Sequence, residues 1–95
     1  MKLVYSKESI QDLIRLREFI AIKNPEAAKR IAAELIARIQ QLCLFPAMGR
    51  PVELAPTPEA IRDFVFGDYI VRYSIHNGAL TILRIWHHLE DMNKR

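Results

Sequence analysis

The sequence has little cysteine and glycine and no long apolar run. Cys43 is its single cysteine, so no disulfide can form within one chain, and we expect the cytoplasm as its compartment. Its three glycines form no glycine-rich loop of the kind that cradles phosphate. No window approaches the roughly 18 apolar residues that span a bilayer, and residues 1–5 lack the apolar region of a signal peptide. These features predict a soluble, unexported protein without a disulfide framework or a nucleotide-binding loop.

The excess of positive charge is also small. Fourteen Lys and Arg residues oppose eleven Asp and Glu residues, which gives a net charge of +3. A mildly basic surface suits an acidic protein segment or nucleic acid, and a solvated basic surface is equally consistent with it. With 95 residues, 51% of them hydrophobic, the chain is expected to form a single domain over residues 1–95.

The first half of the chain predicts a strand and two helices. Residues 2–5 are β-prone, and Ser6 after them is a good helix N-cap. Apolar residues then recur at three- and four-residue steps as far as about Lys23. Asn24-Pro25 ends this helix and opens a second one to about Leu44, because the residue before a proline avoids the α region and proline favours the first helical position. So short a link predicts an antiparallel helical hairpin.

The second half of the chain predicts strands. Asn77-Gly78 lies between two alternating runs, residues 69–76 and 79–88, and is the strongest short-range signal for a β-hairpin. Residues 61–66 read as a preceding strand, joined to the hairpin through Gly67-Asp68. We therefore predict an α+β fold: an N-terminal strand, an antiparallel two-helix hairpin and a three-stranded antiparallel meander that forms one sheet packed on the helices.

A two-residue hairpin loop also predicts the strand register. The expected pairs are His76 with Ala79, Tyr73 with Ile82, Val71 with Arg84, and Tyr69 with Trp86. Because side chains alternate along a strand, one face is expected to be core. That face holds Tyr69, Val71, Tyr73, Ile75, Leu80, Ile82, Arg84 and Trp86. The other face is part apolar and part polar, which suits a surface that meets a partner. It holds Ile70, Arg72, Ser74, Thr81, Leu83, Ile85 and His87.

Three side chains on these strands invite a chemical interpretation. Arg72 could hold a phosphate or a carboxylate, or it could be an ordinary exposed strand residue. Arg84, placed on the core face, needs a carboxylate, and we predict a structural ion pair with Asp12 or Glu8 of the first helix. His87, on the face of Arg72, could act as an acid or base near neutral pH.

Metal and cofactor sites are not expected. His76 is at the hairpin tip, and the adjacent pair His87-His88 would point to opposite faces of a strand, which does not suit metal coordination. No serine lies in a nucleophile motif. We therefore expect no metal ion and no cofactor.

Taken together, the order of elements resembles one known family. Phe45-Pro46-x-x-Gly49-Arg50-Pro51 follows the second helix, and the strands read Tyr69-Ile70-Val71-Arg72-Tyr73 and Ile82-Leu83-Arg84-Ile85-Trp86-His87. This pattern resembles the RelE/ParE toxin superfamily of bacterial type II toxin–antitoxin modules, most of all its ParE-like branch, over essentially the whole chain.

The resemblance implies a small toxin neutralised by a cognate antitoxin, ParD-like or another acidic antitoxin, whose C-terminal segment wraps over the toxin's helices and sheet. It also implies one of two activities. RelE-type members cleave messenger RNA at the ribosome with basic side chains on the sheet and often a tyrosine near the C-terminus. ParE-type members are not known as nucleases and instead poison DNA gyrase.

The sequence departs from the nuclease pattern. Nuclease members place an arginine where this chain has Ile70, the paired lysines are absent from Phe64-Val65-Phe66, and no tyrosine follows Tyr73. Cleavage through a 2′-hydroxyl needs cations and groups that move protons. Arg62, Arg72 and His87 are the residues that would supply a reduced set.

The hypothesis from the sequence is therefore a non-enzymatic, ParE-like inhibitor of gyrase that does not itself bind nucleic acid. The alternatives are a RelE-like endonuclease and an inactive homologue that only binds antitoxin. The expected antitoxin contacts are Ile70, Arg72, Leu83 and Ile85. By the resemblance, target contact is expected in the C-terminal strand and tail, at Trp86, His87, His88, Lys94 and Arg95.

Overall fold

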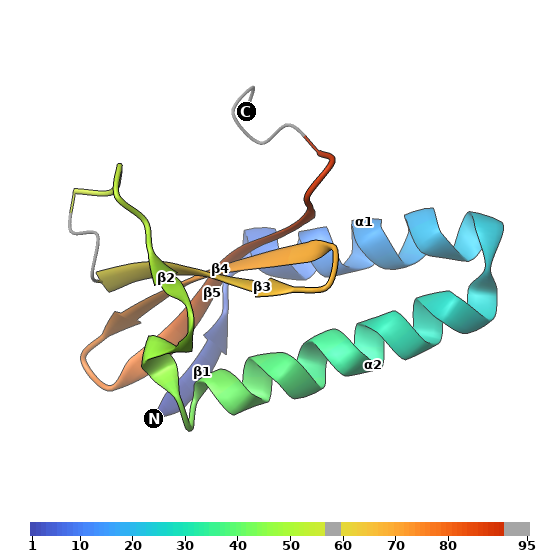
Figure 1. Cartoon of the computed structure of the whole chain (residues 1–95). Helices are drawn as coiled ribbons and strands as arrows, with labels where there is room; N and C mark the ends of the chain where they lie inside the picture. Colours follow the sequence, from blue (N-terminus) through green and yellow to red (C-terminus); the bar gives the residue numbers. More distant parts are fainter. Residues whose placement is uncertain (57–59, 91–95) are drawn as a thin grey trace.

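A computed structural model describes residues 1–56 and 60–90 and shows one mixed sheet beside a helical hairpin (Figure 1). In chain order the elements are β1 (Lys2–Tyr5), α1 (Lys7–Lys23), α2 (Pro25–Leu42), the 3₁₀ helix η1 (Pro46–Met48), β2 (Arg50–Pro51), β3 (Ile61–Phe66), β4 (Tyr69–His76) and β5 (Ala79–His87). The α+β class, the helical hairpin and the three-stranded meander are confirmed. The second helix ends at Leu42 rather than near Leu44.

The sheet has the order β1-β5-β4-β3-β2. The N-terminal strand β1 pairs in parallel with the C-terminal strand β5, and the other neighbours are antiparallel. The short strand β2 at the far edge was not predicted, because two residues that include a proline carry no alternation to detect. The first strand of the chain thus lies beside the last one at one side of the sheet.

Both helices begin where the sequence predicts. Ser6 caps α1, its Oγ accepting a hydrogen bond of 3.0 Å from the Ser9 N–H. Asn24 serves both helices: its N–H donates to the Ile20 carbonyl at the end of α1, and its side chain accepts from the Ala27 N–H at the start of α2. One residue therefore makes the sharp reversal between the antiparallel helices.

The core lies between the sheet and the helical hairpin. Most of the helical side chains in this core come from α2. Its fully or almost fully buried residues are Leu16 from α1, Leu35, Ile39 and Leu42 from α2, and Val71, Tyr73, Leu80, Ile82 and Ile85 from the sheet. The helical hairpin extends past the end of the sheet (Figure 1). That extension leaves Phe19 and Ile22 of α1 exposed.

The hairpin between β4 and β5 contains an irregularity that the sequence did not reveal. Asn77 and Gly78 have positive φ angles of 50° and 73°, and His76 pairs with Ala79 and Tyr73 with Ile82 as predicted. Beyond these pairs the register shifts by one residue, between Arg72 and Tyr73 on β4. Leu83 of β5 is the extra residue of this β-bulge.

The bulge makes two predicted pairs wrong and changes the face of every residue after it. Arg72 rather than Val71 pairs with Arg84, and His87 rather than Trp86 pairs with Tyr69. The core face was predicted for Arg84 and Trp86 and the outer face for Ile85 and His87, and both assignments are reversed. Ile85 is fully buried in the core. An extra residue in a strand inverts the alternation because its period is two.

The Phe-Pro-x-x-Gly-Arg-Pro turn is held by the buried Tyr73. The Tyr73 hydroxyl donates to the Pro46 carbonyl at 2.6 Å and accepts from the Gly49 N–H at 2.9 Å. A Cβ at Gly49 would lie 2.7 Å from the same hydroxyl oxygen, so a side chain does not fit there. Arg62 donates to the Gly49 carbonyl at 2.8 Å. The motif that supports the family resemblance is thus a structural anchor between the helices and the sheet.

Candidate functional site

The first half of α1 covers part of the open edge of β5. Strand β1 pairs with β5 only from Ala79 to Ile82. After that point polar side chains of the helix region take over: Ser6 Oγ donates to the Leu83 carbonyl at 2.9 Å, and Asp12 Oδ2 accepts from the Ile85 N–H at 2.9 Å. An uncovered strand edge invites pairing with other chains, and these bonds close it.

Asp12 is the buried centre of this arrangement. Its side chain is 3% exposed and accepts from Arg84 through two bonds, at 2.8 and 3.1 Å. Arg15 adds a third contact from one helical turn away, at 2.8 Å. Burial alone would raise the pKa of Asp12, but the hydrogen bonds from Arg84 and the Ile85 N–H, with the charges of both arginines, lower it below its usual value. The predicted ion pair between Arg84 and Asp12 is present, although Arg84 reaches it from the outer face.

Arg72 is held at the middle of the outer face. Its Nε and Nη2 donate to the two carboxylate oxygens of Asp63 on β3, at 2.8 and 2.9 Å. Its guanidinium carbon lies 5.1 Å from the centre of the Trp86 ring. The hydrogen bonds to Asp63 raise the pKa of Arg72 above its ordinary value. The charge predicted to meet a partner is therefore already paired and stacked within this chain.

A groove of about 530 Å³ opens between α1 and the C-terminal end of β5. Its apolar lining comes from Leu16, Phe19 and Ile20 of α1, Tyr69 of β4, and Leu89. Charged side chains at the groove are Arg15, Lys23 and Glu90, and His87 completes the lining. Burial, and secondarily the charge of Asp68, raises the pKa of the Tyr69 phenol above its ordinary value. The groove is thus largely apolar, and its charged lining consists of the cations Arg15 and Lys23 and the carboxylate of Glu90.

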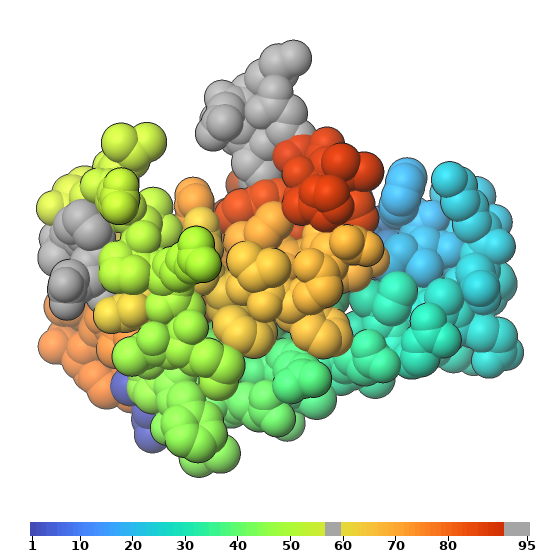
Figure 2. Space-filling view, in the orientation of Figure 1, coloured from blue at the N-terminus to red at the C-terminus, as the bar shows by residue number. Residues whose placement is uncertain are grey.

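The segment after β5 is tied down beside this groove. Glu90 Oε1 accepts from Arg15 at 3.1 Å and from the His87 N–H at 3.0 Å. Nδ1 of His87 accepts from the Leu89 N–H at 3.1 Å, and the rings of His87 and His88 stack with centres 4.7 Å apart. In Figure 2 the last described residues, in red, lie beside the blue atoms of α1. The chain therefore leaves β5 in a compact turn against the helix.

The three residues that would serve a nuclease are not brought together. Arg62 pairs with the buried Tyr73 in the sheet and so faces the helices, whereas Arg72 is on the outer face. His87, predicted to share the face of Arg72, packs edge-on against Tyr69 at 5.4 Å on the helical side. The bulge at Leu83 is the physical reason why His87 lies on the opposite face from the one predicted.

The residues predicted to meet an antitoxin are divided by the same bulge. Ile70 and Arg72 lie on the outer face as predicted, with Ile70 beside Trp86. Leu83 is the bulged residue and is partly exposed. Ile85 is fully buried and is not available to a partner, so its inclusion was wrong.

The residues predicted to meet a target differ in accessibility. Trp86 is 9% exposed and is covered in part by Arg72. The His88 side chain is half exposed, with Nε2 3.6 Å from an Asp68 carboxylate oxygen. Lys94 and Arg95 lie outside the described residues.

Sequence reasoning missed three charged residues that organise the site. Asp63 was detectable, because a two-residue turn at Gly67-Asp68 pairs it directly with Arg72. Arg15 is three positions after Asp12, which also signals a helical pair. Its contact with Glu90 joins residues 75 positions apart, and no local pattern predicts that.

The described residues supply no evident metal centre and no membrane span. Within residues 1–56 and 60–90, no three His, Cys, Asp or Glu side chains are grouped so as to hold a metal ion. No helix in this part of the chain is long and apolar enough to cross a membrane.

Comparison with known proteins places this chain in a family. The model of the ParE toxin of type II toxin–antitoxin systems matches residues 3–92. Toxin RelE1 of Caulobacter vibrioides is 34% identical over 83 residues, which cover 85% of this chain and 86% of that protein. Toxin RelE2 of the same organism is 30% identical over 86 residues, covering 90% and 93% of the two chains.

A solved structure shares the fold. The structure described as a chromosomal ParDE TA system from P. aeruginosa has a TM-score of 0.79 and 20% sequence identity, and the match covers 92% of this chain and 95% of that chain. The fold and these matches define a toxin of a type II toxin–antitoxin system. The chain belongs to the ParE toxin family within the RelE/ParE superfamily, and as such a toxin it has a cognate antitoxin as its partner.

Proposed function

We propose that this toxin acts without catalysis, by binding DNA gyrase, and that an acidic antitoxin holds it inactive. The observation that carries the proposal is the separation of Arg62 and His87 from Arg72, on opposite faces of the sheet. Cleavage of RNA through a 2′-hydroxyl needs a cation and proton-transfer groups around one phosphate.

The state of Arg72 supports the same proposal. Asp63 occupies the guanidinium edge formed by Nε and Nη2, at 2.8 and 2.9 Å, and the guanidinium carbon lies 5.1 Å from the centre of the Trp86 ring. A phosphate could take this bidentate edge only by displacing the Asp63 carboxylate. Arg72 therefore supports the shape of the outer face better than it supports a reacting phosphate.

Target contact is proposed for the segment that follows β5. His88 and Leu89 are exposed there, and Leu89 reaches 79% exposure although it is apolar. The segment is positioned by Glu90 rather than left as a free end. An exposed apolar side chain on a fixed turn is a suitable anchor for a protein surface.

Antitoxin contact is proposed for the groove as well as for Ile70 and Arg72. The groove joins an apolar floor to Arg15 and Lys23, so an amphipathic acidic segment matches it in both polarity and charge. Such a segment would also cover Phe19, which is 61% exposed.

The proposal is tested by measuring gyrase supercoiling and transcript integrity with the same protein preparations. Wild-type toxin should inhibit supercoiling, and Leu89→Ala should weaken inhibition. Leu54→Ala is the matched control, because Leu54 is 98% exposed on the loop after β2. Transcripts cut in a translation extract, without inhibition of gyrase, would establish the endonuclease instead. Inactivity in both assays, with harmless expression in cells, would leave an inactive antitoxin-binding homologue.

A further inference from the structure

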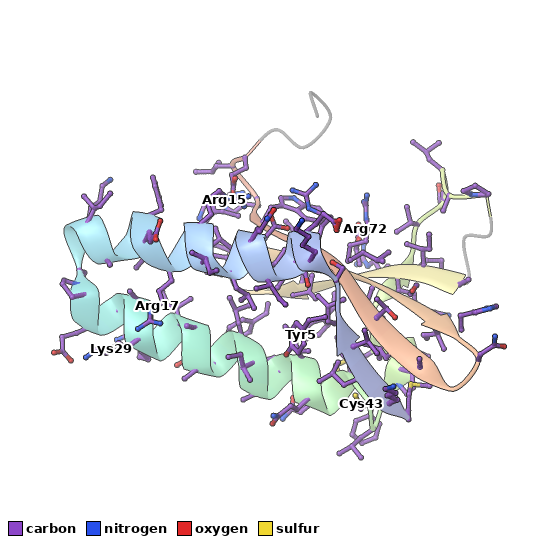
Figure 3. The ribbon with its side chains drawn as sticks, turned by 180° about the vertical axis from the view of Figure 1, so that it is seen from behind. Tyr5, Arg15, Arg17, Lys29, Cys43 and Arg72 are labelled. Atoms are coloured by element: carbon purple, nitrogen blue, oxygen red, sulfur yellow. The ribbon has the colours of Figure 1, made fainter. Side chains whose placement is uncertain are left out.

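The ion pair between Arg15 and Glu90 connects the groove with the C-terminal segment. Arg15 Nη2 donates both to Glu90 Oε1 at 3.1 Å and to the Ile85 carbonyl at 3.3 Å, while its Nη1 donates to Asp12 at 2.8 Å. Figure 3 shows Arg15 on the side of α1 from which the C-terminal segment leaves. One guanidinium therefore joins the buried centre, the end of β5 and the turn after it.

Glu90 in turn closes that turn. The carboxylate oxygen that meets Arg15 also accepts from the His87 N–H at 3.0 Å. Without its contact to Arg15, Glu90 could still form the local turn, but the turn would lose its attachment to α1. The His88 N–H donates to the Asp68 carbonyl at 2.8 Å and ties the turn to the sheet, so the Arg15–Glu90 pair supplies its attachment to the helix.

The same pair lies in the lining of the groove. Arg15 and Glu90 both contribute to its surface, and their side chains are 34% and 26% exposed. An acidic side chain that entered the groove would meet Arg15, where Glu90 already supplies the carboxylate. Arg15 already donates through Nη1 to Asp12 and through Nη2 to Glu90, so a further carboxylate would compete with Glu90 for the Nη2 donors and would be repelled by its charge.

We propose that the Arg15–Glu90 pair is a positioning latch that holds the C-terminal segment for target contact, and that an acidic side chain of the antitoxin releases it by binding Arg15. The inference rests on the proposed function of the C-terminal segment and adds a route by which groove binding changes that segment. Neutralisation then includes withdrawal of Leu89 from its target-binding position, in addition to steric covering.

The latch is tested by two substitutions that should separate the two binding events. Glu90→Gln removes the competing charge and should weaken gyrase inhibition about two- to fivefold while tightening binding of the co-encoded antitoxin by a similar factor, the range for a partly exposed ion pair. Arg15→Gln should weaken both. A residue with only a structural role would not change the two affinities in opposite directions.

Arg17→Gln is the matched control. Arg17 is on the same helix as Arg15 and lies on the side that faces α2 (Figure 3). Its substitution by Gln removes the same charge as Arg15→Gln. It should leave both affinities within twofold of wild type, and thermal melting should show that all three variants are folded.

Tightened antitoxin binding by Glu90→Gln with weakened inhibition supports the latch. Equal changes of the same sign in both assays would overturn it, as would no change in either. Failure of wild-type toxin to inhibit gyrase would instead overturn the proposed function, and the antitoxin arm would still report the competition for Arg15.

Discussion

At the scale of single residues, Asp12 is a buried carboxylate with three charged and backbone partners. It joins the edge of β5 to α1 by accepting from Arg84, Arg15 and the Ile85 N–H. Truncating it leaves a buried N–H and two guanidiniums without their acceptor.

We expect Asp12→Ala to lower the free energy of unfolding by about 2–3 kcal/mol, because buried groups lose charged hydrogen bonds. Arg84→Met should cost only about 1 kcal/mol, since Arg15 and the Ile85 N–H still neutralise Asp12. Urea unfolding of both variants and the double variant would measure their coupling. Strict additivity of the two losses would show that the pair contributes nothing jointly.

The lowered pKa of Asp12 gives the sign of a pH dependence. The folded-state pKa lies below the unfolded value of about 3.9, so the stabilisation is complete above that value and is lost as pH falls through the folded pKa. Asp12→Asn should therefore be less stable than wild type at pH 7, with the difference shrinking below about pH 4. Urea midpoints at a series of pH values test this, and a difference that grows in acid would contradict the assignment.

At the scale of elements, Tyr73 attaches the turn after α2 to the sheet. Tyr73→Phe leaves the Pro46 carbonyl and the Gly49 N–H without their partner and should cost about 1–3 kcal/mol. Gly49→Ala should cost a comparable amount, because the added Cβ would lie 2.9 Å from the Asp63 carbonyl oxygen as well as close to Tyr73. Gly67→Ala probes backbone strain alone, since that glycine has a φ of 56° and open space around it. Unchanged thermal stability of Tyr73→Phe would show that the hydroxyl does not hold the turn.

The bulge of β5 gives a second prediction at this scale. Ile85→Ala should lower the free energy of unfolding by about 2–5 kcal/mol, because it empties space in the core. Ile70→Ala on the partly exposed outer face should change stability much less and should weaken antitoxin binding. Calorimetry and binding measurements on the two variants separate a core residue from a surface residue. The reverse order of destabilisation would place Ile70, not Ile85, in the core.

Local patterns predicted the elements well and the strand faces only in part. Asn24-Pro25 and Asn77-Gly78 determine their turns through their own backbone preferences, so those boundaries were readable. The bulge at Leu83 is marked by no residue type in the sequence, and it inverts the faces of the residues that follow it. The ion pair of Arg84 with Asp12 was predicted correctly although Arg84 was placed on the wrong face of the sheet. The long Arg84 side chain reaches Asp12 on the helix from the outer side.

At the scale of the whole molecule, the groove lies between α1 and the end of β5, while the outer face carries paired charges. From the sequence, the site could be predicted only as a sheet face that suits a partner. Its division into a groove, a latched turn and an ion-paired outer face arises from contacts such as Arg15 with Glu90, between residues distant in sequence. Under the proposed function, these contacts would let the toxin present its C-terminal segment from a fixed position and bind its antitoxin on adjoining surfaces.

The most direct measurement is a titration of purified toxin into a gyrase supercoiling reaction, repeated after preincubation with the co-encoded antitoxin. The account predicts dose-dependent inhibition that equimolar antitoxin abolishes. Supercoiling unaffected at toxin concentrations that cut transcripts in a translation extract would contradict it.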